Sequence, residues 1–313
     1  MIQIDLITGF LGSGKTTFIK KYASYLIKKG LHIGILENDF GAVNVDMMLL
    51  KELEGENCEL EMIAGGCDKE THRRRFRTKL IAMGMSGYDR VIVEPSGIFD
   101  VDEFFDVLYE EPLDQWYKIG NVIAVVDAGL EETLGEQAEY LLASEAAQAG
   151  CVVLSKTKGV SGEQIRSTIA HLNRSMESVH CSRRFGDEVI CRDWEELEDV
   201  DYERILASGF RAEPYEKKSF LQEDFSSLYF MDVKAGREEL VHAAKQMMKD
   251  ETCGKVFRVK GFFREDGGWQ ELNAARGEIT VRPISAGQEV LIVIGEHLNK
   301  KRIGAYFSRS AQN

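Results

Sequence analysis

The sequence predicts an α/β protein whose first domain is a doubly wound, mostly parallel sheet and whose second, smaller domain is α+β. Three observations lead to this prediction. Short apolar segments alternate with helical segments through the first half of the chain, a glycine-rich turn joins the first strand to the first helix, and strands follow one another directly near the C-terminus. Alternating strands and helices indicate a parallel sheet covered on both faces, whereas consecutive strands are typical of an antiparallel sheet.

The elements of the first domain are predicted from apolar patterning. Short apolar runs predict strands over residues 2–7, 32–36, 90–93, 122–126 and 151–154. Apolar residues at helical spacing predict helices over residues 16–29 and 137–149. An acidic stretch over residues 193–208 is predicted as one further helix.

The second domain is predicted from a change in the order of elements. A linker over residues 209–223, which contains Pro214, separates it from the first domain. The expected order is a strand at 227–233, a helix at 238–249, strands at 256–263, 268–273, 278–281 and 290–294, and a helix at 298–307. We therefore predict two domains, residues 1–210 and residues 223–313.

Composition and charge narrow the classes of partner and compartment. The chain has 313 residues and a formal net charge of −13, which argues against a large nucleic-acid footprint because phosphate binding needs a basic face. No apolar run reaches membrane-spanning length, and the first residues do not resemble a signal peptide. The six cysteines are scattered without a C-x-x-C pair. We expect a cytoplasmic protein with free thiols and with neither a membrane nor a nucleic-acid partner.

A phosphate-binding loop is the strongest motif. Residues 9–16 read G-F-L-G-S-G-K-T, match G-x-x-x-x-G-K-[ST] in full, and lie between a predicted strand and a predicted helix. Glycines let backbone N–H groups curl around phosphate oxygens, Lys15 places a cation between the β- and γ-phosphates, and the Thr16 hydroxyl suits Mg²⁺. The motif therefore predicts a nucleoside triphosphate and Mg²⁺ as ligands. The predicted nucleotide-binding residues of this loop are Gly9, Gly12, Ser13, Gly14, Lys15, Thr16 and Thr17.

A carboxylate at the end of another strand completes the predicted phosphate site. The apolar run 91–93 ends in Glu94, and P-loop proteins need an acid there to hold Mg²⁺ directly or through water. Gly97 follows in a sharp turn and can offer its N–H group to a γ-phosphate. We predict catalytic roles for Lys15, Thr16 and Glu94 in the attack of water on that phosphate.

Several motifs in a fixed order resemble one family. They are T-G-F-L-G-S-G-K-T-T at 8–17, E-N-D-F-G at 37–41 followed by Asp46, G-G-C at 65–67, E-P-S-G at 94–97 and V-V-D-A at 125–128. V-K-G-F-F at 259–263, Trp269 and V-I-G-E-H-L at 293–298 extend the match to the second domain. The chain resembles the CobW family of P-loop GTPases, which is related to the nickel chaperones of urease and hydrogenase. The resemblance implies a slow GTPase that couples GTP hydrolysis to metal delivery, or to cobalamin metabolism, for a client protein.

The resemblance also implies a switch segment near the phosphates. Asp39 and Asp46 lie in this segment, and either of them is expected to assist Thr16 and Glu94 in holding Mg²⁺. Together with Gly97, the two aspartates are expected to sense the γ-phosphate and to move on hydrolysis.

One departure from the family pattern affects a thiol loop. The family has C-x-C-C, whereas this chain reads C-D-K-E from Cys67 onward, so one thiol remains. A remnant site for Zn²⁺ or Co²⁺ would use Glu37, Cys67 and Glu70, with His72 nearby. One thiolate with carboxylates binds such metals more weakly than three thiolates do, and Lys69 adds repulsion. The alternative is that Cys67 is a small buried residue beside a glycine turn.

A second departure affects base recognition. GTPases read guanine with N-K-x-D, whereas this chain reads S-K-T-K from Ser155 onward. The Lys156 stem can stack on a purine, but Lys158 can only donate hydrogen bonds where the family's aspartate accepts two. Because such a charged hydrogen bond contributes roughly 1.5–3 kcal/mol, we expect GTP and ATP to bind within about tenfold of each other. Ser155 and Lys156 complete the predicted nucleotide-binding residues.

These departures leave two functions open. The first is a nucleotide-driven metal or cobalamin-linked chaperone that uses GTP. The second is a nucleotide-switched regulatory protein that binds a partner and has lost metal delivery and strict guanine specificity. A small-molecule kinase fits less well, because no acceptor pocket or mobile arginine can be located in the sequence.

Overall fold

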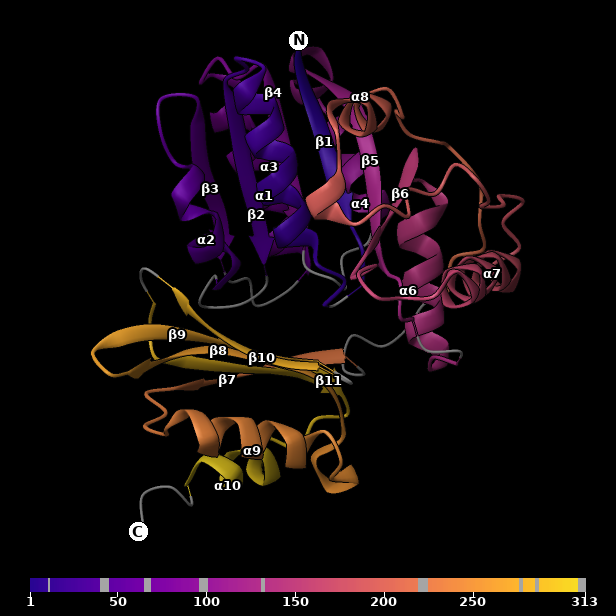
Figure 1. Cartoon of the computed structure of the whole chain (residues 1–313). Helices are drawn as coiled ribbons and strands as arrows, with labels where there is room; N and C mark the ends of the chain where they lie inside the picture. Colours follow the sequence, from indigo (N-terminus) through magenta and orange to yellow (C-terminus); the bar gives the residue numbers. More distant parts are fainter. Residues whose placement is uncertain are drawn as a thin grey trace. The chain divides into compact units, whose positions relative to one another are not determined.

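A computed structural model describes residues 1–10, 12–39, 45–64, 69–95, 101–130, 133–218, 225–275, 278–284 and 287–308. The chain divides into two compact units, Met1–Lys218 and Ser219–Asn313, and this division falls inside the predicted linker. The first unit contains a six-stranded parallel sheet, and the second contains a five-stranded antiparallel sheet (Figure 1). The predicted fold class is therefore confirmed.

The strands of the first unit follow the order β3-β2-β4-β1-β5-β6. They are β1 (Ile2–Thr8), β2 (Ile33–Asp39), β3 (Cys58–Ala64), β4 (Arg90–Pro95), β5 (Tyr117–Asp127) and β6 (Cys151–Ser155). The sequence patterning did not predict β3, which lies at an edge of the sheet. Its Glu59 and Glu61 alternate with apolar residues, so this half-exposed strand does not read as an apolar run.

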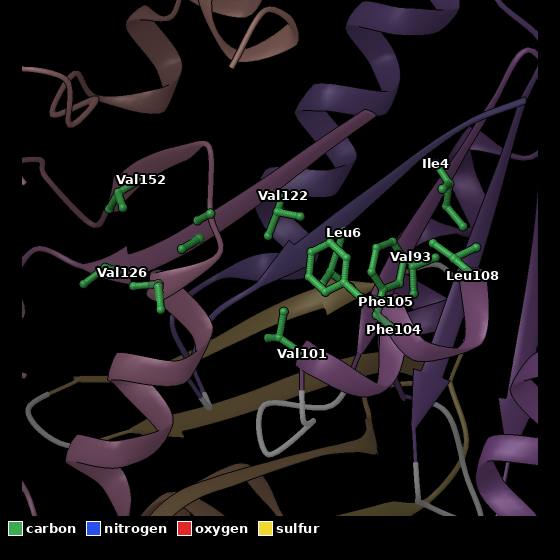
Figure 2. Close-up of a cluster of buried hydrophobic side chains, with 14 of the residues drawn as sticks. Ile4, Leu6, Val93, Val101, Phe104, Phe105, Leu108, Val122, Val126 and Val152 are labelled. Carbon is green, nitrogen blue, oxygen red and sulfur yellow. The ribbon is translucent and has the colours of Figure 1, made fainter. Parts of the chain in front are cut away.

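Helices cover both faces of this sheet. They are α1 (Lys15–Lys28), α2 (Val45–Leu50), α3 (Lys69–Gly84), α4 (Val101–Leu108), α5 (Leu113–Trp116), α6 (Glu136–Ala147), α7 (Gly162–Ser178) and α8 (Asp199–Leu206), with 3₁₀ turns at Lys51–Leu53 and Trp194–Glu196. One buried cluster joins the sheet to α3, α4, α6 and α7, and Figure 2 shows Leu6 and Val93 of the sheet beside Phe104 of α4. The other cluster joins the opposite face to α1 and α8. Both faces are buried because every strand is connected through a helix.

The single acidic helix predicted over residues 193–208 is wrong. The backbone is extended at Leu197 and Glu198, and α8 begins only at Asp199. A capping box starts the new helix: the Asp201 carboxylate accepts a hydrogen bond from the Glu198 N–H at 2.9 Å. The 3₁₀ turn Trp194–Glu196 is therefore separate from α8. Trp194 of this turn packs against Phe18 of α1, with ring centroids 5.5 Å apart.

The second unit is built as its patterning predicts. Its strands follow the order β10-β9-β8-β11-β7, with all pairs antiparallel. Its elements are β7 (Phe225–Met231), α9 (Arg237–Met247), a 3₁₀ turn (Glu251–Cys253), β8 (Lys255–Glu265), β9 (Gly268–Ala275), β10 (Glu278–Ile284), β11 (Val290–Glu296) and α10 (Lys300–Ser308). Leu240 of α9 and Ile303 of α10 belong to one buried cluster with Leu272 and Val293 of the sheet. Among the helices described in either unit, none is long and apolar enough to cross a membrane.

A buried polar network ties four elements of the first unit together. The fully buried Asp5 carboxylate of β1 accepts hydrogen bonds from the Tyr22 hydroxyl of α1 at 2.8 Å and from the Asn121 N–H of β5 at 2.7 Å. It also pairs with the Arg90 guanidinium of β4 at 2.6 Å. Burial, followed by the Asp5 charge, raises the pKa of Tyr22 well above its ordinary value. The Asp5 carboxylate is therefore fully paired and central to the sheet.

Replacing Asp5 by alanine should strongly destabilise the first unit. The Asp5→Ala change leaves the largely buried Arg90 without its counter-charge, and breaking a buried pair in this way costs about 3–5 kcal/mol. Urea denaturation followed by circular dichroism measures the loss. Glu52→Ala removes an exposed ion pair with Lys20 and serves as the control, with an expected change of about 1 kcal/mol or less. Equal effects of the two changes would contradict the role given to Asp5.

Candidate nucleotide-binding site

The phosphate loop has a backbone that only glycine can adopt. Gly9, Gly12 and Gly14 all have positive φ, and a Cβ at Gly9 would lie 2.3 Å from the carbonyl oxygen of Val125 in β5. The Lys15 Nζ donates a hydrogen bond across the loop to the Gly9 carbonyl at 2.8 Å. The lysine is buried, so its cation lies inside the loop and faces the backbone that the motif assigns to phosphate. The loop and α1 therefore have the geometry that phosphate binding requires.

Two predicted magnesium ligands lie beside each other. The Thr16 hydroxyl at the start of α1 donates a hydrogen bond to Glu94 Oε1 near the end of β4 at 2.9 Å. Glu94 is buried, and the side-chain oxygens of Thr16 and Glu94 are hard ligands of the kind that Mg²⁺ prefers. The residues present therefore fit a magnesium ion at this point, next to the phosphate loop.

The predicted transition-metal residues have different surroundings. Glu37 of β2 is buried and lies opposite Glu94 of β4 in the strand register, so the two side chains project from the same face of the sheet. Glu70 is exposed on α3, and Cys67 lies outside the described residues. His72 is buried, and its pKa is lowered to about 4, mainly by burial and further by the Arg75 charge. Within the described part of the chain, no three Asp, Glu, His or Cys side chains are grouped to hold a metal ion.

The switch residues are placed only in part. Asp39 is the last residue of β2, and Asp46 lies in the first turn of α2. Gly97 lies outside the described residues, as do the central residues of the switch segment. The roles of Asp39, Asp46 and Gly97 toward Mg²⁺ and the γ-phosphate therefore stay predictions.

The base-reading segment follows β6 as expected from its sequence. Ser155 is buried as the last residue of that strand, and Lys156 has a φ of +53°. The Lys156 Nζ pairs with Asp127 Oδ2, at the end of β5, at 2.6 Å. The other Asp127 oxygen accepts a hydrogen bond from the Gly129 N–H at 2.8 Å. The lysine stem is thus anchored at the carboxyl edge of the sheet, while Lys158 is exposed.

Trp194 is a site residue that the sequence analysis missed. A Cβ placed at Gly14 would lie 3.3 Å from Trp194 Cη2 and 3.5 Å from Ser155 Cβ, so the indole and the first residue of the base-reading segment both approach the same glycine of the phosphate loop. Its Nε1 is buried and has no hydrogen-bond partner among the described residues. The one available signal was a lone aromatic residue within an acidic segment that was predicted to be helical.

Glu145 is a second residue that the sequence analysis missed. Its side chain on α6 is only 2% exposed, and its Oε2 finds no hydrogen-bond partner within the described ranges. Burial raises the pKa of Glu145 to about 8, although the nearby charge of Lys15 lowers it in part. This carboxyl is therefore largely protonated at neutral pH, within electrostatic range of the phosphate-loop lysine. A glutamate inside the apolar run A-S-E-A-A was the signal for it.

The fold and the site together define the class of the protein. P-loop nucleoside triphosphatases have a glycine-rich turn between a strand and a helix, as this chain has between β1 and α1. Here Lys15 crosses the turn to Gly9, and Thr16 is hydrogen-bonded to Glu94 near the end of β4. Residues 3–183 match the CobW/HypB/UreG nucleotide-binding domain, and the chain belongs to this family. The resemblance inferred from the motifs is therefore confirmed.

Relatives of this chain include proteins named as zinc chaperones. It is 28% identical over 182 residues to zinc chaperone YjiA of Escherichia coli K12, covering 55% of each chain. It is 30% identical over 131 residues to zinc chaperone YeiR of the same organism, covering 42% of this chain and 39% of YeiR. The chain thus spans about half the length of the curated relatives it matches, or less. The crystal structure of Zn(II)-bound YjiA GTPase from E. coli aligns over 98% of both chains at 19% identity, with a TM-score of 0.37.

The Glu145→Gln change should alter how stability depends on pH. The folded protein holds the Glu145 proton up to about pH 8, whereas the unfolded chain releases it near its ordinary value of 4.5. Wild-type stability is therefore lost as the pH rises between these values, by roughly 1.4 kcal/mol per pH unit, and glutamine removes this loss. Urea denaturation from about pH 5 to pH 8 should show the variant gaining stability relative to wild type.

A matched control is available on the same helix. Glu136→Gln removes an exposed carboxylate at the start of α6 and should leave the pH dependence nearly unchanged. If Glu145→Gln shifted stability by the same amount at every pH, the carboxyl would be ionised in the folded protein, contrary to our assignment.

Proposed function

We propose that this chain is a slow GTPase of the CobW type that couples its nucleotide state to the delivery of a metal ion to a client protein. The observation that supports this most directly is the joined geometry of the phosphate loop, in which Lys15 crosses to Gly9 and Thr16 contacts Glu94. Because YjiA and YeiR are named zinc chaperones, Zn²⁺ is the proposed cargo. The cysteines placed within the described residues are free thiols, which supports a reducing, cytoplasmic location.

The chain's own residues account for the proposed hydrolysis. Backbone N–H groups of the loop and of the first turn of α1 hold the phosphates, and Lys15 neutralises charge on the β- and γ-phosphates. Thr16 and Glu94 would hold Mg²⁺, which neutralises further charge when bound. Turnover should be slow, because the basic helix α3 commits two of its arginines elsewhere: Arg73 and Arg77 pair with Glu110 at 2.6 and 2.9 Å. An arginine finger would therefore have to come from another arginine of the chain, from a partner or from a rearrangement.

A second candidate function is a nucleotide-switched regulator that binds a partner without carrying metal. The chemistry of the thiol loop favours it, since Lys69 and Glu70 replace two of the family's three cysteines. In addition, Glu70 is exposed, whereas Glu37 is buried beside Glu94. Exposed carboxylates bind Zn²⁺ far less strongly than a set of thiolates.

Replacing Lys15 by alanine should weaken GTP binding by roughly 10- to 150-fold, the equivalent of about 1.5–3 kcal/mol for charged hydrogen bonds. Isothermal titration calorimetry with Mg²⁺ and GTP measures this change. Lys20→Ala, on an exposed turn of the same helix, is the matched control and should leave the affinity unchanged. Nucleotide binding by Lys15→Ala as tight as that of the unaltered protein would remove the basis of the proposed function.

Metal titration separates the two candidate functions. We expect weak Zn²⁺ or Co²⁺ binding, with a Kd above about 1 µM, because one thiolate with carboxylates replaces three thiolates. Cys67→Ala should weaken this binding, and Cys191→Ala, at a partly exposed thiol elsewhere in the first unit, should not. A sub-micromolar affinity for Zn²⁺ or Co²⁺ that Cys67→Ala abolishes would contradict weak metal binding by this loop. Complete absence of metal binding would favour the regulatory function over metal delivery.

A further inference from the structure

We propose that Trp194 is a specificity-determining residue of the nucleotide site. Its indole provides a purine-selective contact in a chain whose base-reading segment lacks the guanine-binding aspartate. The inference rests on the proposed binding of nucleotide at the phosphate loop, and it predicts selection for purines without selection between guanine and adenine.

The position of the indole is the first argument. Trp194 Cη2 and Cζ3 lie 3.3 and 3.5 Å from the point that a Cβ of Gly14 would occupy, and Ser155 Cβ lies 3.5 Å from the same point. Gly14 ends the phosphate loop, and Ser155 begins the base-reading segment. Because a nucleotide spans from the phosphate loop to that segment, the ring lies at the junction between its two ends.

The rigidity of the ring is the second argument. The Asp193 carboxylate accepts a hydrogen bond from the Glu195 N–H at 2.9 Å and caps the 3₁₀ turn that carries Trp194. Glu195 also forms an ion pair with Lys21 of α1 at 2.9 Å, which ties this turn to the helix that follows the phosphate loop. The ring itself packs on Phe18 at an angle of 59°. A ring held in this way loses little further freedom when a base contacts it.

The indole N–H is the third argument. Trp194 Nε1 can only donate a hydrogen bond, it is buried, and the described residues provide no acceptor for it. Purine bases of both kinds carry the N7 acceptor, so a donor at this junction suits either base. Stacking of a base on the indole would add affinity without discriminating guanine from adenine, so the selectivity for purines comes from the N7 hydrogen bond.

The lysines of the base-reading segment do not supply guanine specificity. Lys156 is paired with Asp127 at 2.6 Å, so its stem is fixed against the end of β5. Lys158 is exposed and donates only, so it cannot accept the guanine N1–H and amino protons. Recognition then depends on contacts that both purines share.

The test compares ligands with and without a base. Calorimetry with Mg²⁺ measures the affinities of GTP, ATP, CTP and inorganic tripolyphosphate for the unaltered protein, Trp194→Leu and Trp194→Phe. We expect Trp194→Leu to weaken GTP and ATP alike, by roughly 10- to 100-fold, and to leave tripolyphosphate within about twofold. Trp194→Phe, which keeps an aromatic face, should recover part of the loss. Trp269→Leu, in the second unit, is the control and should change nothing.

A role in packing alone predicts a different result, because a disturbed phosphate loop would weaken tripolyphosphate in parallel with the nucleotides. That result would overturn the inference, as would unchanged GTP and ATP affinities in Trp194→Leu. If the unaltered protein bound neither tripolyphosphate nor GTP, the proposed function would fail as well, so the two failures are distinguishable.

Fluorescence provides a second readout that keeps Trp194 in place. The chain has three tryptophans, so Trp116→Phe combined with Trp269→Phe leaves Trp194 as the sole tryptophan emitter. GTP and ATP should change its emission, and tripolyphosphate should change it little. Equal changes with all three ligands would show that the ring reports loop closure and does not contact the base.

Discussion

The first unit depends on the close approach of the turn after β1 to the neighbouring strand β5. At Gly9 the backbone passes so near the Val125 carbonyl that a side chain would lie 2.3 Å from it. With a positive φ at Gly9, the loop curls so that the Gly9 carbonyl lies 2.8 Å from the Lys15 ammonium. The same curl starts α1 at a point where Thr16 reaches Glu94 of the strand on the other side of β1. One steric constraint thus positions the cation and the oxygen donors together.

The strand order explains why groups distant in sequence meet at this loop. β1 lies between β4 and β5 in the sheet. The carboxyl ends of β4 and β5 therefore lie on either side of the turn that follows β1, as expected at a switch point of a parallel sheet. β4 contributes Glu94, and Asp127 at the end of β5 pairs with Lys156, the residue that follows β6. The buried Asp5 network joins β1, β4, β5 and α1 through one carboxylate, so the strands that carry the site cannot shift independently. The buried polar network therefore joins β1, β4 and α1, the elements that also carry the proposed phosphate-binding groups.

Local patterns predicted much of this arrangement, and the failures have physical causes. The phosphate loop, the strand ending in Glu94 and both sheets could be predicted because their signals are local: fixed glycine spacing, apolar runs and alternation. β3 was missed because an edge strand carries glutamates on its exposed positions. The helix predicted over residues 193–208 was wrong because composition does not reveal a capping box at Glu198. Trp194 and Glu145 gain their significance from neighbours far away in sequence, which no local pattern encodes.

Two of the changes that separate this chain from its family's motifs lie where solvent reaches them. Lys158 and Glu70, which replace a base-reading aspartate and a thiol, are both exposed, so neither costs the fold an unpaired buried charge. Lys15 and Glu94 of the proposed phosphate site, in contrast, are buried and hydrogen-bonded to Gly9 and Thr16, so a change in either would also disturb the turn after β1. Residues at such exposed positions can therefore change at little cost to the fold, whereas the geometry proposed to bind a triphosphate is part of the folded sheet itself.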